Sequence, residues 1–272
     1  MKYLILAAVL AATSAHAREV STLVYNQTKD VVVVGNHLNV TRPIASLTKL
    51  MTAMVSLDHD GNLARKIKTK GSNTIPPGEY SREDLMTAML VRSDNGAAEA
   101  IANDYPGGRK AFITAMNAKA QAIGMMFTKF SDPTGLSSNN MSNAVSVGIL
   151  LKSAIDYDFI RNNSTKKKIF IERRKYTLVL DNTNKMLLYD FDEAIISKTG
   201  FTNSAGWSVA MVLEKDSQRF SVVVLGAASR DQRYAVAKKL IDNYFRELSL
   251  EKEQEIMYNN NKSFYQKLLD WF

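Results

Sequence analysis

The 272-residue sequence contains no cysteine. No disulfide bond can form within the chain, so the sequence excludes a disulfide scaffold and also a lipoprotein anchored through a cysteine. Histidine is scarce as well, because the chain has three of them. With so few of these ligands, the usual zinc sites are not expected. We therefore predict neither a metal site nor a cofactor.

Two histidines follow the N-terminal segment, His37 after a predicted hairpin and His59 after the first predicted helix. Neither belongs to a nucleophile motif such as GxSxG, so a serine–histidine hydrolase is not indicated. We expect both histidines to be surface or loop residues.

Long hydrophobic runs are also missing beyond the first few residues, since no later segment reaches the roughly 18 apolar residues that span a bilayer. Residues 1–17, MKYLILAAVLAATSAHA, combine a basic start with a short apolar run and small residues at the end. This pattern is typical of a secretory signal peptide. It predicts a mature chain beginning at Arg18 and a periplasmic location.

The chain is basic, with a formal net charge of +8, and removal of Lys2 with the predicted signal peptide leaves +7. Such a charge fits an anionic polymer or membrane nearby, although a basic solvated surface explains it equally well. Nucleic acid is not expected as a partner, because the predicted export and the lack of an aromatic-basic motif both argue against it. The hydrophobic content of 46% is that of a globular protein.

Strand and helix patterns alternate along the chain in a defined order. β-Branched runs predict strands at 21–25 and 31–35, helical periodicity predicts helices at 46–58, 81–91, 109–123 and from about 142, strands return after about 168, and a helix closes at 233–248. This order predicts an α/β (α+β) fold, with one antiparallel sheet of about five strands built from both chain ends and with flanking helices. We expect one catalytic domain over 18–248, with a helical subdomain inserted at about 60–165.

A serine followed three positions later by a lysine occurs three times, at Ser46/Lys49, Ser164/Lys167 and Ser249/Lys252. Ser164 lies in the lysine-rich run NNSTKKK, which predicts an exposed turn. Ser249 lies on an evenly charged helical surface. Only Ser46 lies at the apolar start of a helix, in IASLTKLMTAM, where Lys49 is one turn further on the same side. A partly buried lysine near other cations, such as Lys198, favours the neutral amine that a general base requires.

Two further motifs follow, Ser93-Asp94-Asn95 at a helix break and Lys198-Thr199-Gly200 at the end of an apolar strand. The three motifs in this order are a signature shared by class A β-lactamases and penicillin-binding proteins. Ser93 and Asn95 suit a proton relay to a leaving amine and a contact with a substrate amide. Lys198 and Thr199 suit a substrate carboxylate, and Gly200 allows close approach.

The chain resembles the low-molecular-weight D-alanyl-D-alanine peptidases, through PIASLTKLMTA, SDN, DPTGL at 132–136 and SKTGFTNSAG at 197–206. The stretch at 105–125 is similar to the periplasmic endopeptidases of the penicillin-binding protein 7 type. The resemblance implies the β-lactamase/DD-peptidase-like fold, peptidoglycan as substrate, a Ser46 acyl-enzyme and covalent inhibition by β-lactams. It also implies that the N–H groups of Ser46 and Phe201 form the oxyanion hole.

Three functions remain open: an endopeptidase that cuts cross-links, a carboxypeptidase that trims terminal D-alanine, and a β-lactam sensor or wall-binding module without turnover. The lack of membrane-spanning helices disfavours the sensor. Between Asn95 and Lys198 the glutamates Glu99, Glu172 and Glu193 do not match the deacylating glutamate of class A β-lactamases. A bound β-lactam is therefore expected to stay attached.

The predicted tail, residues 249–272, ends in SFYQKLLDWF. Its apolar residues stand at near-helical spacing, namely Phe264, Leu268, Trp271 and Phe272. Peripheral membrane contact is one interpretation. Because the segment is short and weakly basic, we favour packing or a contact with partners in the wall machinery.

Overall fold

The computed structural model describes residues 19–188 and 191–269. The predicted signal peptide lies outside the described residues. The side chains of 255 and 259–272 are also outside them, so the apolar residues predicted for the tail are not described.

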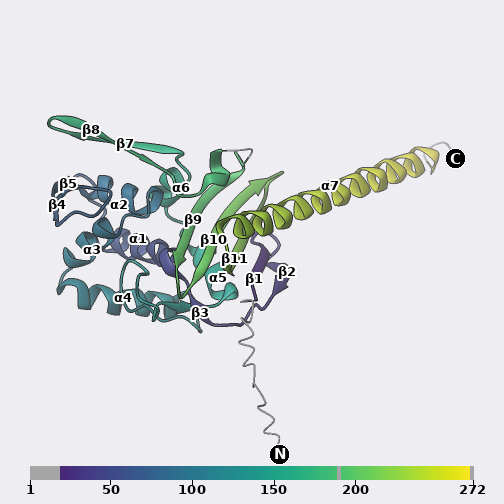
Figure 1. The fold of residues 1–272 in the computed structure, drawn as a ribbon. Coiled ribbons are helices and arrows are strands. Elements are labelled where there is room, and N and C mark those ends of the chain that lie inside the picture. The colour runs from purple at the N-terminus through teal and green to yellow at the C-terminus, as the bar shows by residue number, and fades with distance from the viewer. Residues whose placement is uncertain (1–18, 189–190, 270–272) are drawn as a thin grey trace, which may run out of the picture.

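A five-stranded antiparallel sheet forms the centre of the molecule (Figure 1), in the order β2-β1-β11-β10-β9. The strands are β1 (Ser21–Asn26), β2 (Val31–Asn36), β9 (Ala194–Thr202), β10 (Gly206–Lys215) and β11 (Gln218–Ala227). The two ends of the chain meet where Ser21 pairs with Leu225. The prediction of one sheet built from both ends is confirmed, and β9, which carries the KTG motif, is an edge strand.

Both faces of the sheet are covered by helices. Neighbouring residues of a strand point to opposite faces, so adjacent residues of β1 pack into different cores. On one face, Leu23 packs into a core with helices α1 (Thr48–His59) and α5 (Ala144–Ala154). On the other face, Val24 packs against the first turns of α7 (Arg230–Leu269). The sheet is therefore held between two helical layers (Figure 1).

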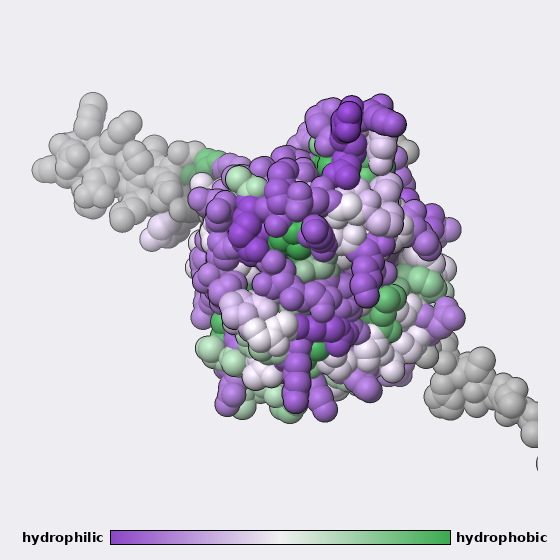
Figure 2. All heavy atoms as spheres, turned by 90° about the vertical axis from the view of Figure 1, so that its left-hand side faces the viewer, coloured by the Kyte–Doolittle hydropathy of each residue, from purple (hydrophilic) through white to green (hydrophobic). Residues whose placement is uncertain are grey.

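The inserted subdomain is mainly helical, as expected, with α2 (Arg82–Val91), α3 (Asn95–Asn103), α4 (Gly108–Ala122) and α6 (Asp158–Ser164). At the start of α2, Ser81 and Asp84 form the capping box that satisfies free backbone N–H groups. Mostly hydrophilic side chains cover the face seen in Figure 2, with small hydrophobic patches between them.

Four short strands were not predicted: β3 (Arg42–Pro43), β4 (Lys66–Thr69), β5 (Gly78–Ser81) and β6 (Met141–Ser142). They form two small sheets, β3 with β6 and β4 with β5. Strands of two to four residues are too short to show a clear alternation in the sequence.

The strands at 168–181 are correctly predicted as strands, but they do not join the central sheet. Within the described ranges, β7 (Lys168–Arg173) and β8 (Tyr176–Asp181) pair only with each other, as a separate hairpin (Figure 1). The side-chain amide of Asn182 closes its base by donating to the carbonyls of Ser164 and Lys166 at 3.0 and 2.9 Å.

The predicted exposed turn at Ser164 is wrong. Ser164 ends α6 and is fully buried, and its hydroxyl accepts a hydrogen bond of 3.3 Å from the Ser197 N–H. The end of α6 packs against β9, which buries Asn163 and Ser164, while the three lysines that follow at 166–168 are exposed. Ser249 is exposed on α7, as expected.

Helix α7 is longer than the predicted helix at 233–248, and it crosses the expected domain boundary without a break. Its C-terminal part projects away from the body (Figure 1). Near residue 250 an ion pair of 2.7 Å between Lys29 and Glu251 ties it to the turn after β1. Within the described part of the chain, no helix is both long and apolar enough to cross a membrane.

Candidate active site

Ser46 lies in a 3₁₀ turn, η1 (Ala45–Leu47), that leads directly into α1. Ile44 and Leu47 on either side are fully buried, so the turn is anchored in the core. Ala45 has a positive φ of 46°, which is unusual for a residue with a side chain. A Cβ on Gly135 would lie 1.9 Å from the Ala45 carbonyl oxygen. The DPTGL loop therefore presses on the backbone beside Ser46, and only glycine fits there.

Lys49 is one turn further along and completely buried. Its Nζ donates to the Ser46 Oγ at 2.9 Å, to the Asn95 Oδ1 at 2.7 Å and to the Thr134 carbonyl at 2.5 Å. Three acceptors match the three protons of an ammonium group. When Lys49 loses one proton, its lone pair can accept the proton of the Ser46 hydroxyl.

Burial lowers the pKa of Lys49 to about 7, while the carboxylates of Asp132, Asp94 and Glu99 act in the opposite direction. A large fraction of the amine is therefore neutral near pH 7. The sequence had suggested crowding by Lys198, but desolvation is the main cause. Lys198 is also buried, and its pKa is lowered first by burial and then by the positive charges of Lys49 and Arg233.

The loop that supplies the Thr134 carbonyl is organised by Asp132. Its carboxylate accepts hydrogen bonds from the N–H groups of Thr134, Gly135 and Ser137 at 2.6 to 2.7 Å. Burial raises the pKa of Asp132, but these bonds outweigh it, so the pKa lies below its usual value. This arrangement is typical of an Asx turn, which the Asp-Pro-Thr-Gly sequence itself could have indicated.

Asn140 joins this loop to α1. Its side-chain oxygen accepts from the N–H groups of Ser131 and Asp132 at 2.6 and 3.1 Å, and its amide donates to the Thr48 hydroxyl at 3.1 Å. Asn140 is fully buried. The sequence interpretation missed it, because nothing local connects it with Thr48.

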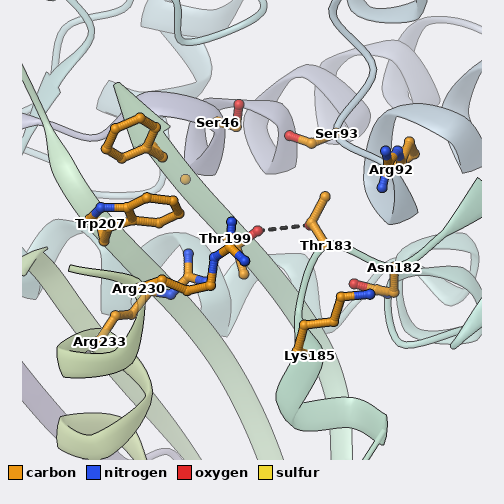
Figure 3. A pocket seen from close by; sticks show the side chains of 12 residues that line it. Ser46, Arg92, Ser93, Asn182, Thr183, Lys185, Thr199, Trp207, Arg230 and Arg233 are labelled. Carbon is orange, nitrogen blue, oxygen red and sulfur yellow. Dashed lines mark hydrogen bonds between the residues drawn. The ribbon is translucent and has the colours of Figure 1, made fainter. Parts of the chain in front are cut away.

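The SDN motif occupies the break between α2 and α3. Asp94 caps α3 by accepting from the Ala97 N–H at 2.7 Å, and its other oxygen accepts a hydrogen bond from the Ser72 hydroxyl. Ser93 has a positive φ of 64°. The tight turn directs Asn95 toward Lys49 and places Ser93 on the same cavity as Ser46 (Figure 3).

The KTG motif runs along β9, directly beside Ser46. A Cβ on Gly200 would lie 3.0 Å from the Ile44 carbonyl oxygen and 3.1 Å from the Ser46 nitrogen, so glycine allows the strand to pass this closely. The Thr199 hydroxyl donates to the Thr183 hydroxyl at 2.7 Å (Figure 3). The backbones of Ser46 and Phe201 thus belong to adjoining segments, as a shared oxyanion hole requires.

These segments enclose a cavity of about 290 Å³. It is lined by Ser46, Arg92, Ser93, Asn182, Thr183, Lys185, Thr199, Gly200, Phe201, Trp207, Arg230 and Arg233. Lys49 and Lys198 do not line it, because they are buried beneath its surface. Asn95 is half-buried and lines a neighbouring cavity together with Thr134. Phe201 is 45% exposed and stacks on Trp207, with ring centroids 4.0 Å apart. The structure thus brings all eight predicted site residues together. Five of them line the cavity, and the other three lie next to it or beneath it.

The basic residues of this cavity were not predicted. They come from three separate regions: Arg92 from the end of α2, Lys185 from the short helix η2 (Lys185–Leu188), and Arg230 and Arg233 from the start of α7. The only local signal is that Arg92 directly precedes the SDN motif.

None of the three glutamates considered above lines this cavity. Glu99 and Glu193 form ion pairs with Arg109 and Lys215, and Glu172 accepts from the Thr177 hydroxyl.

Both histidines lie away from the site: His37 pairs with Glu19, and His59 packs on Tyr105. The described residues contain no cluster of acidic or histidine side chains suited to a metal ion.

Comparison with known proteins identifies the family. The family model described as D-alanyl-D-alanine carboxypeptidase matches residues 8–229. A D-alanyl-D-alanine endopeptidase of Escherichia coli is 38% identical over 85% of this chain and 79% of its own length. Its counterpart in Pseudomonas aeruginosa is 36% identical over 81% and 75%.

Solved structures agree with this result. Penicillin-binding protein D2 from Listeria monocytogenes, in its ampicillin-bound form, is 26% identical with a TM-score of 0.74, over 82% of this chain and 95% of that one. The DD-transpeptidase of Streptomyces K15 has the same fold, with a TM-score of 0.77 and 22% identity over 83% of this chain and 97% of that one. The chain belongs to the D-alanyl-D-alanine carboxypeptidase family and is a serine peptidase.

Proposed function

We propose that this serine peptidase is an endopeptidase that cuts D-alanyl cross-links between the stem peptides of peptidoglycan, in the periplasm. The observation that carries the proposal is the 2.9 Å contact between Ser46 Oγ and Lys49 Nζ, with Lys49 buried and its pKa lowered to about 7. This pair supplies a nucleophile and a base at neutral pH. The relatives named as endopeptidases support the choice of reaction.

In the acylation step, neutral Lys49 takes the proton of Ser46, and Oγ attacks the carbonyl carbon of the D-alanine. The N–H groups of Ser46 and Phe201 hold the developing oxyanion. The hydroxyl of Ser93 passes a proton to the departing amine while the C–N bond breaks, and Lys49 gives the proton that it took from Ser46 to Ser93. The product is an ester on Ser46 and a free amine on the second stem peptide.

In the second step a water molecule attacks the ester, and neutral Lys49 takes its proton. Lys49 then gives this proton to Oγ as the bond to Oγ breaks, which restores Ser46 and the neutral amine and releases a free D-alanine carboxylate. Asn95 holds the substrate amide in both steps and keeps Lys49 oriented through the 2.7 Å hydrogen bond.

Lys198 and Thr199 have different parts in binding the substrate carboxylate. Thr199 lines the cavity, so its hydroxyl makes the contact. Lys198 is 1% exposed, so it acts through its positive field from below.

β-Lactams enter the same reaction as covalent inhibitors. Ser46 opens the β-lactam ring, and the amine that would otherwise depart stays tethered to the acyl group. The tethered amine stays where the attacking water would otherwise enter, and no glutamate lines the described cavity to serve as a second base for water, so the adduct persists.

The second candidate is a carboxypeptidase that removes terminal D-alanine, as the description of the family suggests. Digestion of purified sacculi distinguishes the two. An endopeptidase lowers the number of cross-linked dimers, whereas shortened pentapeptides with an unchanged number of dimers would contradict the proposal. The matched controls are Ser46→Ala, which should abolish cleavage, and Ser249→Ala, which removes the exposed serine of another Ser-x-x-Lys pair and should leave cleavage intact.

A further inference from the structure

Among the residues that the structure describes, four basic side chains and no acidic one border the cavity beside Ser46. Among the described residues, Arg92, Lys185 and Arg230 take part in none of the ion pairs that neutralise cations elsewhere. A concave site lined by one sign of charge attracts ligands of the opposite sign. The cavity is therefore suited to a ligand with several negative charges.

The two arginines of α7 are partly occupied within the protein. Arg233 is 2% exposed, donates to the Ser208 carbonyl at 3.2 Å and lies over the Tyr234 ring at 4.3 Å. The Arg230 guanidinium lies 5.1 Å from the centre of the Trp207 ring. Together with Trp207, the two arginines form one side of the cavity, which is both aromatic and basic (Figure 3).

Arg92 and Lys185 are exposed, like Arg230, but they lie on the other side of the cavity, across from Trp207 (Figure 3). Their backbones are fixed: the Arg92 N–H donates to the Ala88 carbonyl at 2.9 Å, and the Lys185 N–H donates to the Tyr234 hydroxyl at 3.1 Å. Fixed backbones reduce the entropy lost when these side chains bind a ligand.

The position of Arg92 connects this side of the cavity with the leaving group. Arg92 directly precedes Ser93, whose hydroxyl faces the same cavity as Ser46. In the proposed reaction Ser93 protonates the departing amine, so the leaving group occupies the part of the cavity that Arg92 borders.

Two possible leaving groups differ in charge. A terminal D-alanine carries one carboxylate, which Thr199 and Lys198 can hold. A second stem peptide carries further carboxylates beyond the first, and these reach further from Ser46. On the leaving-group side of the cavity, Arg92 and Lys185 therefore have carboxylates to bind only when the substrate is cross-linked.

We propose that Arg92 and Lys185 bind carboxylates of the second stem peptide and so select cross-linked peptides over single ones. This inference rests on the proposed endopeptidase function and names the residues that determine its specificity. Arg92 contributes a planar fork of donors that matches a carboxylate, and Lys185 contributes a point charge.

The test compares two soluble substrates, a cross-linked peptide dimer and an uncross-linked pentapeptide. Enzyme concentrations are set by titrating Ser46 with penicillin, so a loss of folded protein does not affect the comparison. The readout is the ratio of kcat/KM for the dimer to kcat/KM for the pentapeptide. A charged hydrogen bond contributes about tenfold, so the ratio should fall roughly 10-fold in Arg92→Gln or Lys185→Gln and about 100-fold in the double variant.

The matched control is the double variant Arg174→Gln/Lys175→Gln. It removes the same two charges from exposed positions at the end of the β7–β8 hairpin and should keep the wild-type ratio. A second control changes the substrate: when the carboxylates of the second stem are amidated, wild type should lose its preference, and the Arg92/Lys185 double variant should not respond.

An unchanged ratio in the Arg92/Lys185 double variant would overturn the inference, and so would an equal loss in the Arg174/Lys175 control. If wild type forms the penicillin adduct but does not cut the dimer, the proposed endopeptidase function itself fails. The two failures are therefore distinguishable.

Discussion

Lys49 Nζ donates a 2.7 Å hydrogen bond to Asn95 Oδ1, which joins helix α1 to the SDN loop 46 residues away in the sequence. The bond orients the amine toward Ser46, whose Oγ lies 2.9 Å from the same nitrogen. Asn95 is uncharged, so it positions Lys49 without stabilising its protonated form as a carboxylate would.

Replacing this amide by a carboxylate should therefore inactivate the enzyme near neutral pH. In Asn95→Asp the new negative charge next to Lys49 raises its pKa, and the neutral amine forms only at higher pH. We expect the pH profile of acylation by a fluorescent penicillin to move to higher pH by at least one unit, which is about 1.4 kcal/mol of interaction. An unshifted profile would show that Lys49 is not the group that titrates.

The wild-type enzyme should show the corresponding titration near pH 7. Burial lowers the pKa of Lys49 to about 7, so the neutral, reactive amine increases as the pH rises through that value. The second-order rate constant for acylation should therefore increase from pH 5 to pH 8 and then level off. A rate that is independent of pH, or that falls over this range, would contradict a neutral lysine base.

The buried charge of Lys198 should reduce stability while it supports binding. Lys198 is 1% exposed, and desolvation lowers its pKa well below the usual value. Replacement of buried charges by apolar side chains of similar size often stabilises a protein by about 1–4 kcal/mol. Lys198→Met should therefore unfold at a higher temperature than wild type but acylate more slowly. Lys110→Met, at an exposed position on α4, should change neither property.

The melting temperature of Lys198→Met also shows whether the expected stabilisation is wrong. A lower Tm for Lys198→Met, measured by calorimetry, would mean that the ammonium group is compensated in the folded state.

The amide of Asn140 should be needed for both folding stability and activity. It joins the DPTGL loop to Thr48 and is fully buried, so Asn140→Ala leaves several buried polar groups without partners. We expect a loss of about 2–4 kcal/mol in the free energy of unfolding, together with slower acylation at 25 °C. Denaturant titration measures the first effect. The neighbouring Asn139 is exposed, and equal losses in Asn139→Ala and Asn140→Ala would refute this role.

Periodic features of the sequence predicted much of this fold. The β-branched runs, the helical spacing after Pro43 and the Ser81/Asp84 capping box depend on neighbours in the chain, and each is present. The isolation of the β7–β8 hairpin and the burial of Ser164 depend instead on contacts with Asn182 and β9. Such contacts between distant segments leave no periodic signal.

The candidate site divides in a similar way. Three short motifs predicted the residues around Ser46, because each motif combines a reactive group with a recognisable local structure. The role of Asn140 was missed, because Asn140 reaches Thr48 only in the folded chain. The basic cavity was missed for the same reason, since folding brings Lys185 and Arg230 to one site. The cause of the lowered pKa of Lys49 also required its burial to be known.

We propose that Ser46 is the nucleophile and that Lys49 activates it. Intact-protein mass spectrometry after incubation with penicillin, followed by peptide mapping, measures both roles. We predict one covalent adduct on the peptide that contains Ser46, its loss in Ser46→Ala, a decrease of several orders of magnitude in its rate of formation in Lys49→Ala, and its retention in Ser249→Ala. An adduct that forms at the wild-type rate in Ser46→Ala, or that maps to another serine, would show that Ser46 is not the nucleophile.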